Sequence, residues 1–392
     1  MNIRRLLADS LMQAAKGFKV LAILGPRQSG KTTLAQTTFP DYTYASLEDP
    51  ETLLRAQQDP RGFLHDVSQG KGVILDEFQK FPVLLSYLQG IVDETHRPGF
   101  FVLTGSQNFL MNQAITQTLA GRIAIFTLLP LSICELAQAN LLKDLNQTMH
   151  VGFYPPLYLP TLTQVELWHA SYIQTYLERD VRDLKLVVDL SLFQLFVRLC
   201  AGRIGQVLNV TSLANDCGIS SNTANAWLGI LEASYIIFLL RPHYKNFSKR
   251  LIKSPKLYFY DVGLACSLLN IAPEQLSTHY LRGGLFESMV IAELHKSFYN
   301  RSMRPSIYFW RDHVGHEVDC IIEGGLKLIP IEIKSGKTVG GDFFDGLSYW
   351  NKLADADSTN ASVVYAGDQN TKGNKGNIVA WNNVDSIISY NL

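Results

Sequence analysis

The residues with the clearest chemistry lie in one loop, Gly25-Pro-Arg-Gln-Ser-Gly-Lys-Thr32, which matches the pattern GxxxxGK[ST] in full. Its glycines let the backbone fold back so that N–H groups line an anion nest, and the helix expected after it adds its positive dipole end. Lys31 then reaches the β- and γ-phosphates, and the Thr32 hydroxyl binds Mg²⁺. The loop therefore predicts a nucleotide site. The predicted contacts in and after the loop are Gly25, Pro26, Arg27, Gln28, Ser29, Gly30, Lys31, Thr32 and Thr33.

An acidic pair, Asp76 and Glu77, follows the apolar run 72–75, which has the composition of a buried parallel strand. A carboxylate at such a strand end can hold Mg²⁺ through water, and an adjacent glutamate can polarise the attacking water. We assign Asp76 to the metal and Glu77 as the general base. The alternative is a pair of solvated carboxylates at a strand end.

A third short apolar run, 101–103, leads into Ser106, Gln107 and Asn108. As in P-loop ATPases of the AAA type, a polar residue at this strand end is expected to contact the γ-phosphate and the water. The sequence does not choose among the three, and Ser106 and Gln107 join Asp76 as predicted nucleotide contacts. Arg122, in a region otherwise free of charge, is expected to act as an arginine finger from the same or a neighbouring subunit, or to form a structural salt bridge.

Other classes of P-loop protein carry signatures that this sequence lacks. A GTPase needs an NKxD guanine reader, but the pairs Asn351-Lys352 and Asn374-Lys375 lack the aspartate and lie far from the loop. An LSGGQ-type transporter signature is also absent. We therefore expect ATP, with Mg²⁺, as the cofactor.

A second constellation lies in the C-terminal third, where Asp319, Glu332 and Lys334 follow Glu287 along the chain. Residues 281–296 indicate a helix entered through two glycines, and the runs 306–310, 317–322 and 328–334 alternate like strands. On a strand, Glu332 and Lys334 share one face, and Asp319 on the paired strand can meet them.

Such a group of carboxylates can hold Mg²⁺, and a lysine can position water and stabilise developing negative charge. We predict Glu287, Asp319 and Glu332 as metal ligands, and Asp319, Glu332 and Lys334 as catalytic residues. The order helix-glutamate, strand-aspartate and strand-ExK is the layout of the PD-(D/E)xK nuclease fold. The alternative is the same sheet with an ion pair that no longer cuts.

The middle of the chain predicts a DNA-contacting module. After a long charged helix at 168–183, residues 211–231 have the pattern of a helix-turn-helix, and the runs 234–240 and 257–260 indicate two strands. This order is typical of a winged helix. Six basic residues without one acid suit a phosphate backbone: Arg241, Lys245, Lys249, Arg250, Lys253 and Lys256. The alternative is a protein-interaction module.

Composition limits the remaining choices. The chain has 392 residues, 35 basic and 35 acidic side chains and 47% apolar residues, which excludes disorder of the whole chain and a globally basic protein. Five scattered cysteines without a CxxC pair favour a reducing compartment. The longest apolar stretches, around 124–133 and 235–240, are shorter than the ~20 residues that span a bilayer. We expect a cytoplasmic protein without membrane contact, and an arginine finger that acts between subunits would require a homo-oligomer.

These motifs together resemble the predicted bacterial and archaeal AAA-type ATPases with a C-terminal PD-(D/E)xK nuclease-like domain of largely unassigned function. The resemblance rests on GPRQSGKTT, ILDEFQ, TGSQ and LAGR, then on YIQTYLERDVRDL, WLGILEASYIIFLL and KRLIKSPKLYFYD, and finally on FE, EVD and IEIKSG. Val318 stands where the nuclease motif has proline. The implied α/β architecture is a P-loop AAA-type ATPase core at 1–155, a helical lid plus winged helix at 156–265, and a restriction-endonuclease-like domain at 266–392.

Three functions follow from this architecture. The first is an enzyme that hydrolyses ATP to control a DNA-contacting winged helix and a Mg²⁺-dependent nuclease-like domain. The second is an ATP-switched DNA-binding regulator whose C-terminal domain binds but never cleaves. The third is an ATP-dependent scaffold that holds protein partners.

Overall fold

The computed structural model describes residues 3–94, 97–106, 118–161, 164–176, 187, 189–243, 253–325, 327–355 and 358–391. Contacts between these residues divide the chain into two compact units. Unit 1 comprises Met1–Leu131 with two short segments, Ala233–Tyr235 and Tyr299–Met303. Unit 2 comprises Ser132–Glu232, Ile236–Phe298 and Arg304–Leu392. The three-part division at 155 and 265 stays a prediction.

Unit 1 is built on a parallel sheet with the strand order β2-β3-β4-β1-β5. The strands are β1 (Val20–Gly25), β2 (Thr43–Ser46), β3 (Val73–Asp76), β4 (Phe101–Ser106) and β5 (Ile123–Thr127). Near-continuous apolar runs suit strands that are covered on both faces. The predicted α/β class with a parallel sheet is therefore confirmed.

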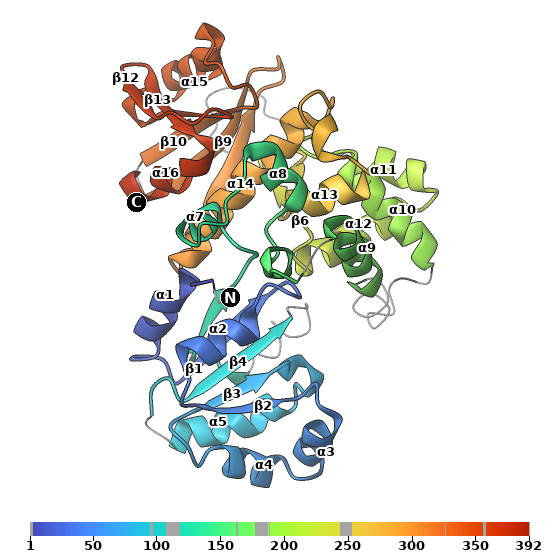
Figure 1. Ribbon diagram of the computed structural model, residues 1–392, viewed down its shortest axis with the longest axis vertical. Coiled ribbons are helices and arrows are strands. Elements are labelled where there is room, and N and C mark those ends of the chain that lie inside the picture. The colour runs from blue at the N-terminus through green and yellow to red at the C-terminus, as the bar shows by residue number, and fades with distance from the viewer. Residues whose placement is uncertain are drawn as a thin grey trace. The chain divides into compact units, whose positions relative to one another are not determined.

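Helices cover both faces of this sheet (Figure 1). Alternate residues of β1 point to opposite sides: Leu21 and Ile23 pack with one apolar cluster, and Val20, Ala22 and Leu24 with another. The first cluster includes side chains of α1 (Leu7–Ala14) and α2 (Lys31–Thr38). The second includes side chains of α3 (Pro50–Gln58), α4 (Pro60–Val67) and α5 (Leu84–Glu94). Unit 1 thus has three layers, α/β/α.

Unit 2 begins with helices. They are α7 (Ile133–Gln138), α8 (Leu145–Val151), α9 (Val165–Tyr176), α10 (Leu190–Ala201), α11 (Val210–Cys217), α12 (Ser221–Ala233), α13 (Val262–Leu268) and α14 (Arg282–Asn300), of which α14 ends within unit 1. The helix predicted at 168–183 is described as α9 up to Tyr176. Among the described helices, none is long and apolar enough to cross a bilayer.

Two consecutive helices, α11 and α12, lie where the helix-turn-helix was predicted. Gly218, between them, has φ +72°, a left-handed conformation that favours glycine. Trp227 of α12 packs edge to face on Phe193 and Phe196 of α10, with ring centroids 5.1 and 5.3 Å away. An antiparallel hairpin of β6 (Ile237–Leu240) and β7 (Lys256–Phe259) follows.

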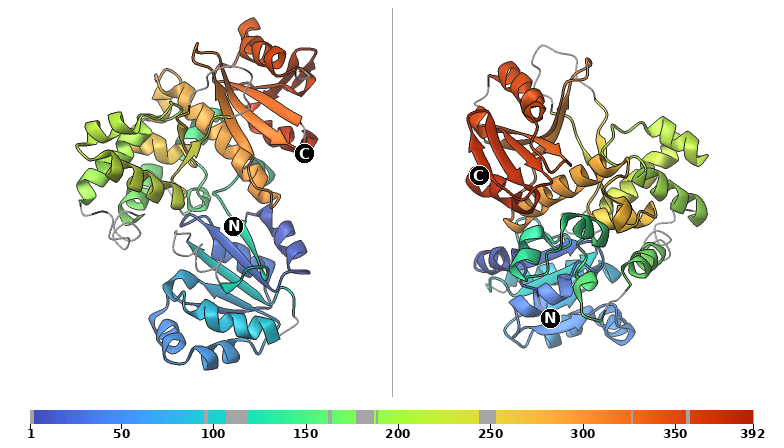
Figure 2. Two further views of the ribbon diagram at one scale, coloured as in Figure 1. Left: turned by 180° about the vertical axis from the view of Figure 1, so that it is seen from behind. Right: turned by 45° about the horizontal axis from the view of Figure 1, so that its top comes forward.

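The last third of the chain forms a mixed sheet with the order β12-β13-β11-β10-β9-β8, seen from two directions in Figure 2. Its strands are β8 (Ile307–Arg311), β9 (Glu317–Gly324), β10 (Lys327–Lys334), β11 (Ser362–Tyr365), β12 (Thr371–Gly373) and β13 (Gly376–Ala380). The strands β8 to β10 pair antiparallel, while β11 is parallel to both β10 and β13. Two helices accompany it, α15 (Asp345–Ala354) and α16 (Asp385–Asn391).

The helix predicted at 281–296 is α14, and Gly283 and Gly284 lie in its first turn, as predicted. Glu287, which the sequence also placed in the first turn, falls in the second turn. A Cβ atom on Gly284 would lie 2.5 Å from the carbonyl oxygen of Ile204, so this glycine permits a close approach of two backbone segments.

Candidate nucleotide site and carboxylate cluster

The predicted phosphate-binding loop connects β1 directly to the N-terminus of α2, as its chemistry requires. Gly30 has φ +90° and Gln28 has φ +61°, so two of its residues are left-handed. A Cβ atom on Gly25 would lie 2.2 Å from the carbonyl oxygen of Leu128. The loop is therefore held in a tight conformation at the carboxyl ends of the strands, where α/β sheets bind ligands.

Two basic side chains contact this loop. Lys31 is buried, and its Nζ donates to the carbonyl oxygens of Gly25 at 3.2 Å and Pro26 at 2.8 Å. Arg5 is also buried and donates to the carbonyl oxygens of Ser29 and Leu129, each at 2.7 Å. The sequence assigned no site role to Arg5, because nothing in its neighbourhood along the chain connects it to the loop.

Asp76 ends β3 next to Thr32. The Thr32 hydroxyl donates to the Asp76 carboxylate at 2.9 Å, and the Tyr44 hydroxyl donates at 2.8 Å. Thr104 of β4 is a third hydroxyl donor. Burial, followed by the hydrogen bond and charge of Asp76, raises the pKa of Tyr44 to about 12, so this phenol stays a donor at neutral pH.

This arrangement fits the Mg²⁺ that a P-loop implies. The Asp76 side chain is buried, and in the described part of the chain it has hydroxyl partners but no basic one. A buried charge without a counter-ion is costly, and a hard divalent cation prefers oxygen ligands. Thr32 and Asp76 therefore remain the predicted residues for Mg²⁺.

Glu77 is joined to the end of β4 by a residue that sequence reasoning missed. Gln79 donates through Nε2 to the Glu77 carboxylate and, at 2.9 Å, to the Ser106 hydroxyl. Glu77 itself has φ +51°, a strained conformation of the kind found at functional sites. Because β4 pairs with both β1 and β3, Ser106 lies between the loop and the acidic pair. Gln107 and Asn108 lie outside the described residues.

The position of Arg122 does not support the prediction that it acts as an arginine finger on the loop of its own chain. It forms an ion pair with Asp93, with Nε and Oδ1 2.5 Å apart. Its carbonyl oxygen accepts from Val20 at the start of β1, whereas the loop follows the other end of that strand. Because β1 has six residues, its two ends lie about 20 Å apart, with Arg122 near the first end and the loop at the second. The ion pair with Asp93 agrees with the alternative prediction, a structural salt bridge.

The residues of the predicted nuclease centre do meet in unit 2. Register places Ile331 of β10 opposite Cys320 of β9, which brings Asp319 beside the ExK segment. Asp319 accepts from the Ile333 N–H at 2.8 Å, and the Lys334 ammonium lies 2.6 Å from the Glu332 carboxylate. Glu332 Oε2 is buried and has no hydrogen-bond partner among the described residues.

A lysine that the sequence assigned to DNA lies in the middle of these carboxylates. Lys256 is 3% exposed, and its Nζ lies 2.9 Å from Glu287, 3.9 Å from Asp319 and in contact with Glu317. The Tyr258 hydroxyl donates to Glu287 as well, at 2.5 Å. We call Lys256, Glu287, Glu317, Asp319 and Glu332 the carboxylate cluster. Lys256 as a DNA contact was wrong, because its ammonium is buried and paired.

Burial dominates the titration of this cluster. It raises the pKa of Glu287 to about 7 and of Glu332 to about 8, and in both the charge of Asp319 adds to the effect. Burial alone would lower the pKa of Lys256, but Glu287, Asp319 and Glu317 together raise it above its ordinary value. The ammonium is therefore permanently charged.

The cluster does not fit the Mg²⁺ that a nuclease would need. A cationic group already lies between Glu287 and Asp319, and Lys334 is paired with Glu332. No group of three or more histidine, cysteine or acidic side chains in the described ranges is arranged to hold a metal ion. Glu287, Asp319 and Glu332 are therefore not supported as metal ligands.

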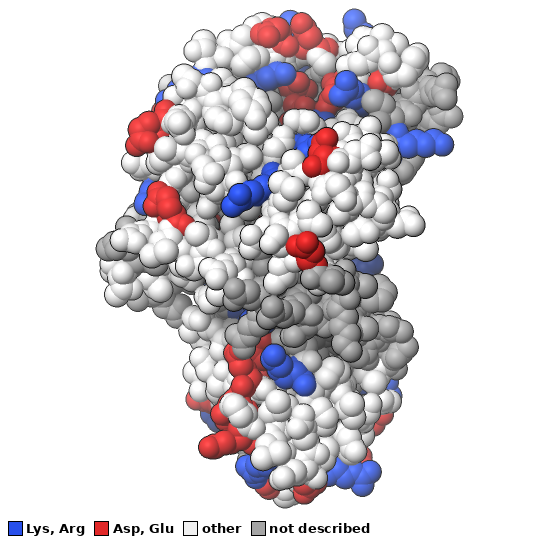
Figure 3. Space-filling view, turned by 90° about the vertical axis from the view of Figure 1, so that its right-hand side faces the viewer, with Lys and Arg blue, Asp and Glu red and all other residues white. Residues whose placement is uncertain are grey.

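Of the other five predicted DNA contacts, the structure describes two. Arg241 and Lys253 are exposed at the two ends of the hairpin connection. Lys245, Lys249 and Arg250 lie outside the described residues. The helices α11 and α12 contain no lysine or arginine. On the face drawn in Figure 3, basic and acidic side chains are interspersed.

Three parts of the sequence match known protein families. Residues 17–137 match the AAA domain, residues 142–275 a domain of unknown function named DUF8612, and residues 282–384 a domain of unknown function named DUF4143. The first match covers the phosphate-binding loop and supports an AAA-type P-loop ATPase. The third does not establish a nuclease.

Two uncharacterized relatives and several solved structures are similar to this chain. Uncharacterized proteins of Mycobacterium tuberculosis and Mycobacterium bovis are each 27% identical over 372 residues, which covers 93% of this chain and 80% of theirs. A Walker-type ATPase of Pyrococcus abyssi has a TM-score of 0.42 at 13% identity and covers 67% of this chain and 94% of its own. AMPPCP-bound DnaA from Aquifex aeolicus has a TM-score of 0.31 at 12% identity and covers 58% and 86%. These scores are too low to support a conclusion about this chain.

Proposed function

We propose that the AAA-type P-loop domain at residues 17–137 binds ATP with Mg²⁺ and hydrolyses it. The observation that carries this proposal is the buried Asp76 carboxylate, which receives the Thr32 hydroxyl at 2.9 Å and has no basic partner in the described part of the chain. Bound Mg²⁺ would neutralise Asp76 and the charge that develops on the phosphates. ATP is favoured over GTP because the sequence lacks a guanine reader.

The side chains around Asp76 take complementary roles in this proposal. Lys31 leaves the loop carbonyls that it contacts and donates to the β- and γ-phosphates. Glu77 accepts a proton from the attacking water, and Gln79 holds that carboxylate in line with Ser106. Arg5 acts on the loop indirectly, because it fixes the Ser29 carbonyl. It is a positioning residue.

Two variants separate binding from hydrolysis. Lys31→Ala should lose binding of a fluorescent ATP analogue, while Glu77→Gln should bind it normally and lose turnover roughly a hundredfold. Glu94→Gln, which changes an exposed carboxylate of α5, serves as the matched control and should leave both unchanged. Normal turnover by Glu77→Gln would remove Glu77 as the base, and unimpaired binding by Lys31→Ala would contradict the nucleotide site itself.

Gln79 offers a test that the sequence did not suggest. Gln79→Ala should lower kcat while KM for ATP changes little, because the amide positions Glu77 and does not itself hold the nucleotide. Gln79→Glu would bring two carboxylates together and should lower kcat further. If KM rises and kcat is unchanged, the amide contacts ATP directly.

A second candidate function is contact with DNA through α11, α12 and the β6–β7 hairpin. It is favoured by the order of these elements and by the exposed Arg241 and Lys253 at the ends of the hairpin connection. Because α11 and α12 carry no basic residue, the hairpin connection would make the contacts, and these would be to DNA phosphates. Cleavage of DNA is not part of this proposal, since Lys256 occupies the carboxylate cluster.

Charge reversal tests this candidate. Arg241→Glu combined with Lys253→Glu should weaken binding of double-stranded DNA and flatten its dependence on salt. Arg304→Glu, an exposed basic residue outside the hairpin, is the matched control. Equal DNA affinity for all three proteins would favour a protein-interaction role for this module.

A further inference from the structure

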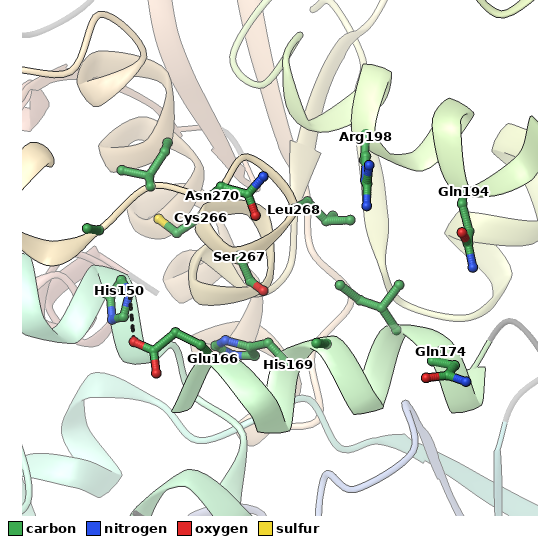
Figure 4. Close-up of a pocket in the computed structure, with 14 residues that line it drawn as sticks. His150, Glu166, His169, Gln174, Gln194, Arg198, Cys266, Ser267, Leu268 and Asn270 are labelled. Atoms are coloured by element: carbon green, nitrogen blue, oxygen red, sulfur yellow. Dashed lines mark ion pairs between the residues drawn. The ribbon is translucent and has the colours of Figure 1, made fainter. Parts of the chain in front are cut away.

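Unit 2 contains a cavity of about 570 Å³ (Figure 4). Its walls come from the end of α8, one face of α9, the middle of α10, and the end of α13 with the turn that follows. None of the residues given to the nucleotide or to the carboxylate cluster lines it. Its volume lies in the range of pockets that take small molecules.

The face of α9 that lines this cavity changes in character along its length. Glu166, His169, Ala170, Ile173 and Gln174 follow the spacing i, i+3, i+4, i+7, i+8, so they share one side of the helix. The face begins with a carboxylate and an imidazole, continues with two apolar side chains, and ends with a carboxamide. Eight residues of α-helix span about 12 Å.

The first end of the cavity is acidic. His150 Nε2 lies 3.6 Å from Glu166 Oε1, and the dashed line in Figure 4 marks this pair. His169 is 1% exposed, lines the cavity, and its Nε2 has no hydrogen-bond partner among the described residues. Burial lowers the pKa of His150 and lowers that of His169 to about 4. Neither imidazole therefore neutralises Glu166 at pH 7, and this end suits an ammonium group.

The other end is basic and amide-rich. Arg198 and Gln194 project from α10 toward the cavity, and Gln174 lies across from them on α9, away from the His150–Glu166 pair in Figure 4. Arg198 has no ion pair or side-chain hydrogen bond in the described part of the chain. A guanidinium group binds a carboxylate through two parallel hydrogen bonds. This end therefore suits a carboxylate group.

We propose that this cavity binds a short peptide with free termini, with the ammonium group at Glu166 and the carboxylate at Arg198. An extended chain of three residues spans about 10 Å, close to the length of the α9 face. The carboxamides of Gln174, Gln194 and Asn270 each donate and accept, as peptide N–H and C=O groups require. The apolar stretch between the two ends takes an apolar central side chain. His169 Nε2 gains the partner that it lacks.

Calorimetry with three forms of one tripeptide tests the proposal on the full chain. The probes are alanyl-leucyl-alanine with free termini, its N-acetylated form and its C-terminal amide. The free peptide should bind saturably, and either cap should weaken binding roughly tenfold or more, because each removes one charged contact. Glu166→Gln should abolish the effect of the N-acetyl cap, and Arg198→Gln should abolish the effect of the amide.

Both substituted side chains are exposed, so the variants should keep the fold and the melting temperature of the unchanged protein. Arg304→Gln, outside the cavity, is the matched control and should retain the full response to both caps. The proposal is overturned if the free peptide does not bind saturably, or if the effects of the caps persist in both cavity variants. Neither outcome bears on ATP hydrolysis, which Glu77→Gln tests separately.

Discussion

Asp76 in unit 1 and Asp319 in unit 2 are both carboxylates on sheet strands, shielded from water, yet their surroundings differ in kind. Asp76 receives three hydroxyl groups and has no basic partner in the described part of the chain. Asp319 lies in the carboxylate cluster, 3.9 Å from the almost fully buried ammonium of Lys256. Hydroxyls leave a negative charge that a cation can still satisfy, whereas the ammonium has already satisfied it.

The contrast explains why we propose Mg²⁺ at one acidic motif and not at the other. Both were predicted to bind Mg²⁺ from carboxylates on strands, at a strand end for Asp76 and in the order helix-glutamate, strand-aspartate, strand-ExK for Asp319. The second set acquires its counter-ion from β7, which lies more than sixty residues earlier in the chain than β9 or β10. Charge balance, not the presence of carboxylates, therefore separates the two regions.

The largest effect should come from Asp76→Asn. ATP turnover should fall roughly a hundred- to a thousandfold, because the variant loses the charge that we propose holds Mg²⁺. The melting temperature of the nucleotide-free protein should stay the same or rise, since a buried charge without a cationic partner is removed. A loss of thermal stability in this variant would show that Asp76 has a structural counter-charge and would break the comparison.

Glu287→Gln should have the opposite profile. It leaves the buried Lys256 with fewer partners, and we expect a loss of about 3 kcal/mol in the free energy of unfolding of unit 2. ATP turnover should be unchanged. Denaturant titration measures the effect, and Glu323→Gln, an exposed carboxylate at the end of β9, is the control. If both variants unfold alike, the ammonium is not held by Glu287.

Lys256→Met should convert the carboxylate cluster into a metal site. Without the ammonium, Glu287, Glu317 and Asp319 repel one another, and Mn²⁺ should bind at least about tenfold more tightly than to the unchanged protein. Calorimetry in an Asp76→Asn background removes the contribution of the P-loop. Saturable Mn²⁺ binding by the protein with Lys256 intact, lost in Asp319→Asn, would restore the predicted nuclease centre.

Glu332 provides a smaller effect that depends on pH. In the folded chain its pKa is raised from 4.5 to about 8, so folding takes up a proton between these values. Stability should therefore fall as the pH rises through this window. Glu332→Gln removes this titration. The melting temperature of the variant, relative to that of the unchanged protein, should therefore increase as the pH rises from about 5 to about 9. Parallel curves would indicate that Glu332 ionises normally.

Arg122→Gln should have the smallest effect. The ion pair with Asp93 is partly exposed, and such pairs contribute little to stability. ATP turnover should stay within about twofold of that of the unchanged protein, because Arg122 lies near the start of β1 and the loop follows the end of this strand. A large loss of turnover that depends on protein concentration would instead show that Arg122 acts on the site of a neighbouring subunit.

The sequence by itself determined the strands β3 and β4 of unit 1, the loop from Gly25 to Thr32 and the acidic pair after β3. These features are local: a phosphate nest needs consecutive residues, and a buried parallel strand shows as a short apolar run. The helix-turn-helix and the strand carrying Glu332 and Lys334 were predictable for the same reason, since helix caps, turns and alternation depend on near neighbours in the chain.

Only the tertiary structure decided what those residues meet. Arg5 contacts a loop more than twenty positions away, Gln79 joins Glu77 to Ser106 across two strands, and Lys256 enters the carboxylate cluster from another sheet. The cavity lined by Glu166, His169 and Arg198 likewise draws on four separate helices. Charge balance and burial are sums over neighbours in space, and spacing along the chain does not contain them. For this reason the sequence identified the carboxylates, and the fold decided which of them are free to bind a metal.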